Sequence, residues 1–229
     1  MIVIIKRFFI LSFSLLLLSN AFAGDTDLYS DHCPLGCPKA ETDMAIVVHS
    51  PYISGINKSN LWTLWTAYKV SPDSFGKRIN AKFKADPLLP NHLQKKPSAY
   101  KGLYKAYKLD RGHMAPASSF SVNKDTAKQT YYLSNINPQP SRLNRGLWAK
   151  IEKWERNNAP LYVMAGVIHN NANKQNHPTG NFWKIILNGN KKYFHSLIFV
   201  KNGNKYCYKN IEINKLEKLT KLSFFKNLP

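Results

Sequence analysis

The chain has 229 residues, of which 44% are hydrophobic, and a formal net charge of +20 at pH 7. This length buries one substantial core but is short for two ordinary domains. So large a positive charge implies an anionic partner, for which nucleic acid, anionic lipid and acidic glycans all qualify. Lysine supplies 27 of the 33 basic residues. Because lysine acts as a point charge on phosphate, the composition favours binding without regard to sequence, with simple solubility as the alternative.

Residues 1–23 have the pattern of a secretory signal, with Lys6 and Arg7 before an apolar stretch and a small-residue end at Ala23. The apolar stretch is shorter than the roughly 20 residues that a membrane-spanning helix needs, although an anchored form stays an alternative. We therefore expect export to the periplasm or the exterior, with no membrane anchor. The mature protein would be a single domain at residues 24–229. Without Lys6 and Arg7 its charge is +18, two less than the +20 of the whole chain.

Cys33 and Cys37 lie on either side of a Pro-Leu-Gly turn. Export would deliver them to an oxidising compartment, where we expect them to form a disulfide. A loop this short stabilises by about 2 kcal/mol in the chain-entropy model, so the bond would pin the mature N-terminus rather than hold the fold. Cys207 is then left over, either as a small buried hydrophobe or as an exposed thiol.

Stretches rich in β-branched and aromatic residues predict the strands of a central antiparallel sheet. In chain order they are residues 44–49, 61–70, 161–168, 181–187 and 193–200. Asn188-Gly189-Asn190 marks a hairpin between the last two. Residues 72–99 contain four prolines and many lysines, and we expect an irregular surface excursion that contributes to a substrate groove. The Asn-rich residues 169–177 are expected to form a polar loop.

One helix is clearly legible. Leu143, Leu147, Ile151 and Trp154 recur at spacings of four, four and three, which gives an apolar stripe that would face the sheet. Residues 211–226 come closest to a basic amphipathic helix for an anionic membrane or glycan surface, but an ordinary docked terminal segment explains them as well. Together the elements predict an α+β fold with helices packed on the antiparallel sheet.

Three polar blocks stand between Asp110 and Glu152. They are Asp110-Arg111-Gly112-His113-Met114-Ala115-Pro116, Asn135-Ile136-Asn137-Pro138-Gln139 and Asn144-Arg145-Gly146-Leu147-Trp148. If the first block is extended, Arg111 and His113 project to one face of the strand and Asp110 to the other.

The second block follows the same alternation. It would place Asn135, Asn137 and Gln139 on one face of a strand. Two such strands paired with each other, and followed directly by the helix, would form a small ββα unit around a pocket.

His113 fits the role of general base in this pocket. An imidazole has an unperturbed pKa of about 6.5, so it is mostly free to accept a proton from water at neutral pH, and the Arg111 charge should favour this form. Arg111 would also stabilise the extra negative charge on a pentacoordinate phosphorus. The alternative is a surface ion pair of Asp110 with Arg111, a turn at Gly112 and a hydrogen-bonded histidine.

Cleavage of a phosphodiester also requires stabilisation of the leaving alkoxide, for which a metal ion is the economical answer. The oxygen-rich side chains of Asn144, Asn135 and Glu152 suit Mg²⁺, with Mn²⁺ as a substitute, better than zinc. On a regular helix Glu152 would lie about 80° from Asn144, so we expect it to hold a metal-bound water, or Arg156, rather than to ligate directly. Asn144 taken alone is more often a helix N-cap than a ligand.

In this order, the blocks resemble the DNA/RNA non-specific endonuclease family, the ββα-metal nucleases of the Serratia nuclease and endonuclease G type. The segment Cys33-Pro-Leu-Gly-Cys37 also resembles the secreted bacterial branch. The resemblance implies a Mg²⁺-dependent hydrolase of DNA and RNA that leaves 5′-phosphate ends.

Residue roles are implied by matching position. They make His113 the base, Asn144 the direct metal ligand and Arg111 a transition-state clamp. Glu152 would hold metal-bound water. The supporting and substrate-binding positions are Asp110, Asn135, Gln139 and Arg156.

Two features depart from the family pattern. The family often has a further catalytic arginine upstream, where residues 82–87 offer lysines and Arg78 is a few residues off register. Its secreted branch also has a C-terminal disulfide, of which Cys207 resembles one half without a partner.

Two functions from different classes therefore compete. The first is an exported, sugar-non-specific endonuclease. The second is an exported basic protein that binds or takes up nucleic acid without turnover. DNA and RNA, bound without sequence preference, are the expected partners of both, and the sequence indicates no particular protein partner.

Overall fold

The computed structural model describes residues 31–77, 79–168, 180–190 and 193–225 of the chain. The expected signal at residues 1–23 and the expected loop at 169–177 lie outside these ranges. No helix within the described ranges is long and apolar enough to cross a membrane.

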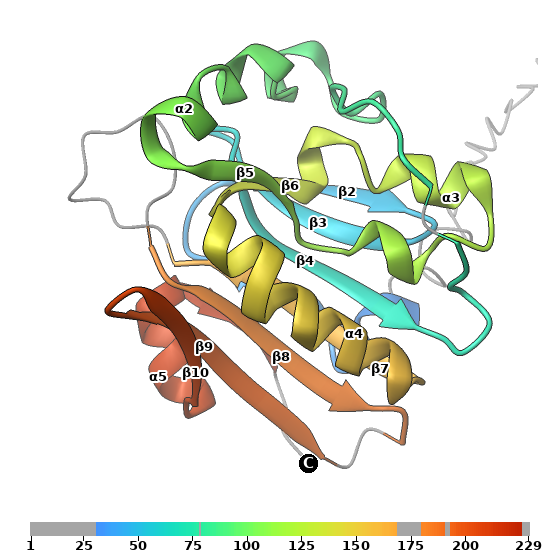
Figure 1. The fold of residues 1–229 in the computed structure, drawn as a ribbon, viewed down its shortest axis with the longest axis vertical. Coiled ribbons are helices and arrows are strands. Elements are labelled where there is room, and N and C mark those ends of the chain that lie inside the picture. The colour runs from blue at the N-terminus through green and yellow to red at the C-terminus, as the bar shows by residue number, and fades with distance from the viewer. Residues whose placement is uncertain (1–30, 78, 169–179, 191–192, 226–229) are drawn as a thin grey trace, which may run out of the picture.

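Seven strands of the described residues form one antiparallel sheet in the order β10-β9-β8-β7-β4-β3-β2 (Figure 1). They are β2 (Met44–His49), β3 (Tyr52–Asn57), β4 (Thr63–Val70), β7 (Leu161–Val167), β8 (Phe182–Asn188), β9 (Phe194–Asn202) and β10 (Lys205–Asn210). All five predicted strands are present, and the predicted α+β fold with a central antiparallel sheet is confirmed.

Strand β3 was not predicted, and its burial explains why. All six of its residues are buried, so the strand lacks the alternation of apolar and polar residues that marks a half-exposed strand. Gly55 interrupts it because Trp65 of β4 crosses there, where an added Cβ would collide with the indole.

The sheet carries a layer on each face. On one face, Trp148 packs against Phe182 and Phe199 with ring centroids 5.7 and 5.0 Å apart. On the other, Trp183 packs against Phe224 at 5.0 Å. Successive residues 182 and 183 thus face opposite layers, as expected for a strand covered on both sides.

The first layer contains α4 (Ala149–Asn157) and the hairpin of β5 (Leu109–His113) and β6 (Ile136–Pro140), as Figure 1 shows. The second contains α5 (Ile213–Thr220) and a small sheet of β1 (Lys39–Ala40) with β11 (Leu222–Ser223). Residues 211–226 thus contain an ordinary docked helix, whose Ile213 and Leu216 are buried. The other α-helices of the described residues are α2 (Leu103–Tyr107) and α3 (Lys124–Gln129).

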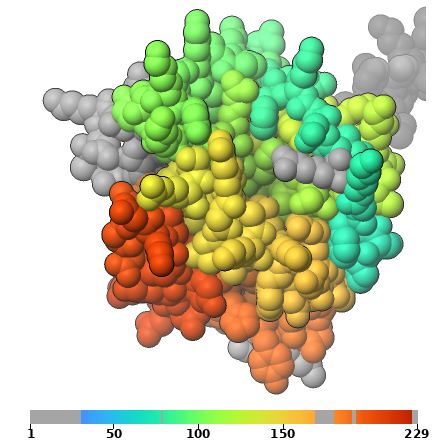
Figure 2. All heavy atoms as spheres, viewed as in Figure 1, coloured from blue at the N-terminus to red at the C-terminus, as the bar shows by residue number. Residues whose placement is uncertain are grey.

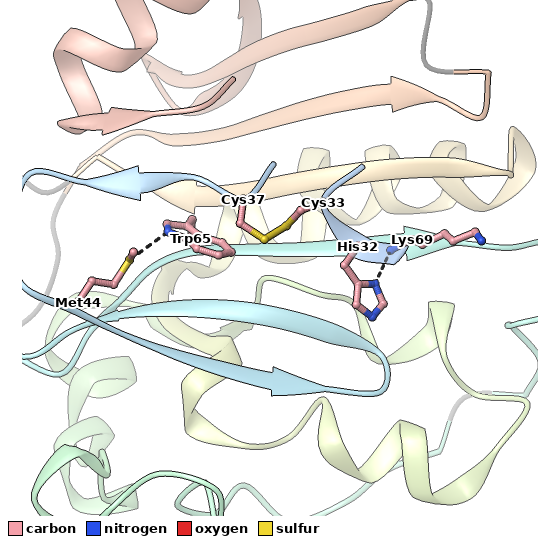
Figure 3. Close-up of a disulfide and its surroundings, with 6 residues drawn as sticks. All are labelled: His32, Cys33, Cys37, Met44, Trp65 and Lys69. Atoms are coloured by element: carbon pink, nitrogen blue, oxygen red, sulfur yellow. Dashed lines mark hydrogen bonds between the residues drawn. A yellow bond between two sulfur atoms is a disulfide. The ribbon is translucent and has the colours of Figure 1, made fainter. Parts of the chain in front are cut away.

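The predicted disulfide is confirmed. Cys33 and Cys37 are joined beside Trp65 (Figure 3). The neighbouring ring of His32 accepts a hydrogen bond from the Lys69 backbone N–H at 3.2 Å, which holds this segment near the C-terminal end of β4. Cys207 is a part-exposed free thiol on β10, intermediate between the two alternatives for it.

Candidate active site

The hairpin and the helix after it form the expected ββα unit. Strands β5 and β6 pair antiparallel, with Arg111 opposite Pro138 and His113 opposite Ile136. A kinked turn at Leu143–Trp148 then leads into α4. In Figure 2 the yellow atoms of this turn and of α4 lie beside the green atoms of the segment around α2, on one face of the molecule.

A cavity of about 360 Å³ opens between these elements. Side chains from β5, from the turn at Leu143–Trp148 and from α4 line it, namely Arg111, His113, Asn144, Arg145 and Glu152. Phe83 and the segment Pro116–Ser118 complete the wall. The structure therefore brings together the predicted base, the predicted cation for phosphate and the two predicted metal-site residues, although they are spread over 42 positions of the chain.

Aromatic rings hold His113 and Arg111 in place. The His113 imidazole lies edge-on to the Tyr131 ring, with centroids 4.8 Å apart, and 5.4 Å from the Phe83 ring. The Arg111 guanidinium lies over the same Phe83 ring at 5.3 Å. Phe83 was not singled out from the sequence. The one available signal was its place in the irregular residues 72–99, which were expected to contribute to a groove.

Asp110 orients the predicted metal ligand. Its carboxylate accepts a hydrogen bond from Asn144 Nδ2 at 2.9 Å and two from Arg145 at 2.6 and 2.8 Å. Since the amide nitrogen of Asn144 is used in this way, its carbonyl oxygen is held on the opposite side of the amide group. The alternative of an ion pair between Asp110 and Arg111 does not hold, because Asp110 pairs with Arg145. The alternative of a helix N-cap at Asn144 does not hold either, because Asn144 lies inside the turn.

The amides of the second block lie beneath the cavity rather than in its wall. Asn135, Asn137 and Gln139 are fully buried, and Asn135 stands in a 3₁₀ turn ahead of β6. Asn135 bonds the backbone of Ala115 in both directions, at 2.8 and 2.9 Å, and Asn137 donates to the Thr63 carbonyl at 2.9 Å.

Gln139 explains the glycine of the first block. Its side chain lies across Gly112, where an added Cβ would collide with the amide. The expected polar face toward the pocket is therefore replaced by a buried scaffold for the hairpin. That Asn135 and Gln139 support the site stays a prediction.

The helix differs from the expected continuous stripe. At Gly146 the backbone leaves helical geometry (φ −109°, ψ −107°), so the turn at Leu143–Trp148 joins α4 across a kink. The kink changes the rotational register, so Trp148 is buried while Trp154 is 42% exposed. The predicted place of Trp154 on the apolar stripe was wrong for this reason.

A buried charged cluster lies under α4. Lys184 of β8 is fully buried, and its Nζ donates to Glu155 Oε1 at 2.5 Å and to the Tyr68 hydroxyl at 3.0 Å. Tyr68 in turn donates to Glu155 Oε2 at 3.0 Å. The cluster was not predicted, because a lysine within an apolar strand is expected to face solvent.

Burial and this cluster act on Glu152. Burial raises the pKa of Glu152 to about 7; the Lys184 charge opposes the shift and the Glu155 charge adds to it. On the same helix, Arg156 Nη1 donates to the Ser118 hydroxyl at 2.9 Å, so Arg156 touches the cavity through one of its lining residues.

The donor chemistry of the cavity fits a hard divalent cation. Asn144 and Glu152, whose side chains carry oxygen donors, both line it. Among the described residues no group of three or more His, Cys, Asp or Glu side chains gathers to hold a metal. A site with few protein oxygens suits Mg²⁺, which keeps several of its waters.

Known proteins are similar to this chain in sequence and fold. Residues 30–229 match the family model described as DNA/RNA non-specific endonuclease. The chain is 28% identical to a nuclease of Serratia marcescens, over 96% of this chain and 89% of that protein. It is 30% identical to a mitochondrial nuclease of Schizosaccharomyces pombe, over 53% of this chain and 39% of that protein.

The fold is similar to a chain in the crystal structure of the EndoG/EndoGI complex. The TM-score is 0.66 at 20% identity, over 86% of this chain and 90% of that chain. At this identity the likeness concerns the fold alone.

Proposed function

Because the chain belongs to the DNA/RNA non-specific endonuclease family, whose members are metal-dependent hydrolases, we propose that it is exported, uses Mg²⁺, and cleaves with His113 as general base to leave 5′-phosphate ends. The observation that carries this proposal is the single cavity lined by Arg111, His113, Asn144 and Glu152. A protein that only bound nucleic acid would need the positive charge but not these four groups together.

His113 would take the proton from the attacking water. The Phe83 and Tyr131 rings restrict its imidazole, so it need not be reoriented for the reaction. Arg111, held over Phe83, would stabilise the charge that accumulates on the phosphorus oxygens.

Asn144 would hold the cation through its carbonyl oxygen, and Glu152 through water. When bound, a divalent cation supplies stabilisation of the leaving alkoxide and of the phosphate charge. Asp110 contributes by fixing the Asn144 amide, and Arg145 by satisfying the rest of the Asp110 carboxylate.

Export rests on the pattern of residues 1–23. One similar nuclease carries the word mitochondrial in its name, so family membership does not decide the location. Sequence-independent binding of DNA and RNA rests on the charge of +20, carried mostly by lysine.

The test compares His113→Ala with the unchanged protein, both produced without residues 1–23. Plasmid DNA, single-stranded DNA and RNA are digested with Mg²⁺, with chelator, and after Mg²⁺ or Mn²⁺ is restored. We expect His113→Ala to lose about 10²–10⁴-fold in rate and to retain binding, because proton transfer contributes about that much.

The matched control is His195→Ala. His195 is an exposed histidine of β9 and is not among the described residues that line the cavity. This variant should cut normally. Equal cleavage by His113→Ala, or undiminished activity in chelator, would remove the base or the metal from the mechanism.

A further inference from the structure

A second cavity, also of about 360 Å³, adjoins the candidate active site. The two cavities share Phe83, Arg111, Asn144 and Arg145 as a common wall. Whatever occupies the second cavity is therefore next to the group bound at Arg111 and Asn144.

The far wall of this second cavity is aromatic and apolar. It comes from the segment around α2, with Tyr100, Leu103 and Tyr104 as its main side chains. Tyr100 is 5% exposed, while Tyr104 is 49% exposed. A half-exposed tyrosine beside a cavity offers a surface on which a flat ring stacks at low cost in conformational entropy.

Cations surround the same ring. The Arg145 guanidinium carbon and the Lys108 Nζ each lie 5.3 Å from the centroid of Tyr104. Arg145 is held there by its two hydrogen bonds to Asp110. The second cavity thus joins an aromatic surface to positive charges, the combination with which proteins bind single-stranded nucleic acid.

We propose that the second cavity binds the base of the nucleotide next to the scissile phosphate, in contact with Tyr104, when the substrate is single-stranded DNA or RNA. This subsite rests on the proposed function, because it takes the scissile phosphate to lie at Arg111 and Asn144. Arg145 and Lys108 would hold the adjoining backbone phosphate.

The cavity discriminates by strandedness because a paired base does not reach it freely. A base in a duplex is stacked and paired, and must first be unstacked, whereas a base in a single strand is available. Every base has a flat face, so a subsite of this kind stays tolerant of sequence.

The first test is the steady-state kinetics of Tyr104→Ala on short single-stranded oligothymidine. We expect KM to rise between about fivefold and a hundredfold, the range for loss of one stacked base, with a smaller change in kcat. On duplex DNA the change should be within about twofold. Tyr104→Trp keeps an aromatic surface and should restore the low KM.

The matched control is Tyr107→Ala. Tyr107 belongs to the same helix and is 51% exposed, but it is not among the described residues that line either cavity. Its KM on oligothymidine should match that of the unchanged protein. An unchanged KM for Tyr104→Ala, or equal losses in both alanine variants, would overturn the subsite.

The second test removes the base instead of the tyrosine. In oligothymidine with one abasic nucleotide, the phosphate on one side of that nucleotide should be cut more slowly than the phosphate on the other side. Tyr104→Ala should cut both phosphates at similar rates. A difference that survives in Tyr104→Ala places the base elsewhere.

Binding of intact and abasic oligothymidine to His113→Ala, followed by fluorescence anisotropy, keeps the two proposals distinguishable. Loss of binding contrast with Tyr104→Ala in that background supports the subsite even if the chain cuts nothing.

Discussion

Among the residues that line the cavity, Glu152 has the most clearly shifted pKa. Its pKa rises from 4.5 to about 7, chiefly because it is buried. The folded state therefore binds this proton more tightly than the unfolded chain does. By linkage, the contribution of Glu152 to stability is greatest below pH 4.5 and is lost as the pH rises toward about 7.

Glu152→Gln tests this at the scale of one residue. Glutamine resembles the protonated carboxyl, so below pH 4.5 the two metal-free proteins should be about equally stable. Above pH 7 the variant should be more stable by up to about 3 kcal/mol, at 1.36 kcal/mol for each pKa unit. Urea unfolding across pH measures the difference.

The same comparison with saturating Mg²⁺ supplies the control. A cation beside the carboxyl favours its ionised form, so the advantage of Glu152→Gln above pH 7 should shrink. A stability difference that is constant with pH would mean that the pKa of Glu152 is the same in the folded and the unfolded protein, and would contradict the shift.

At the scale of elements, α4 is held to the sheet by charge as well as by apolar packing. Lys184 of β8 lies under the helix, bonded to Glu155 and Tyr68 and 4.4 Å from the centroid of the Trp148 ring. The cluster joins β4, β8 and the helix that carries Glu152. Because a buried ion pair needs defined geometry, it specifies where this helix sits along the sheet.

Lys184→Met should destabilise the protein by about 3–5 kcal/mol, because it leaves the buried Glu155 carboxylate without its counter-charge. Urea unfolding measures the loss. Lys184→Met combined with Glu155→Gln removes both charges and should recover part of it. Lys150→Met is the control, because Lys150 is an exposed lysine of α4. It should change stability by less than about 0.5 kcal/mol. A double variant no more stable than Lys184→Met would show that packing, and not charge, holds the helix.

At the scale of the whole molecule, the charge of +20 acts on substrate before any cavity does. Long-range attraction to a polyanion raises the rate of encounter, and each neutralised phosphate releases a counterion. The cavity then needs only to hold one phosphate and its neighbours.

We expect binding of His113→Ala to single-stranded DNA to weaken by at least about tenfold between 50 and 200 mM salt. Fluorescence anisotropy over a salt series measures the slope. DNA and RNA of the same length should give similar slopes, because the charged backbone dominates. A flat response would contradict a lysine-driven approach of the substrate.

What local sequence decides is visible in the ββα unit. The composition of the predicted sheet strands favoured extended structure within a few residues, and the order of Arg111, His113, Asn144 and Glu152 indicated the chemistry of the cavity. These signals are readable because strand alternation, turn preferences and side-chain chemistry act over short distances along the chain.

Tertiary structure alone decided where those groups meet and what surrounds them. Lys184 contacts Tyr68 across 116 positions of sequence, and Phe83 reaches His113 from an irregular segment. The kink at Gly146 turned Trp154 outward, although its spacing predicted the reverse. Pairing of buried charges, packing of rings and the register of a helix depend on neighbours that are distant in the chain, so no local pattern encodes them.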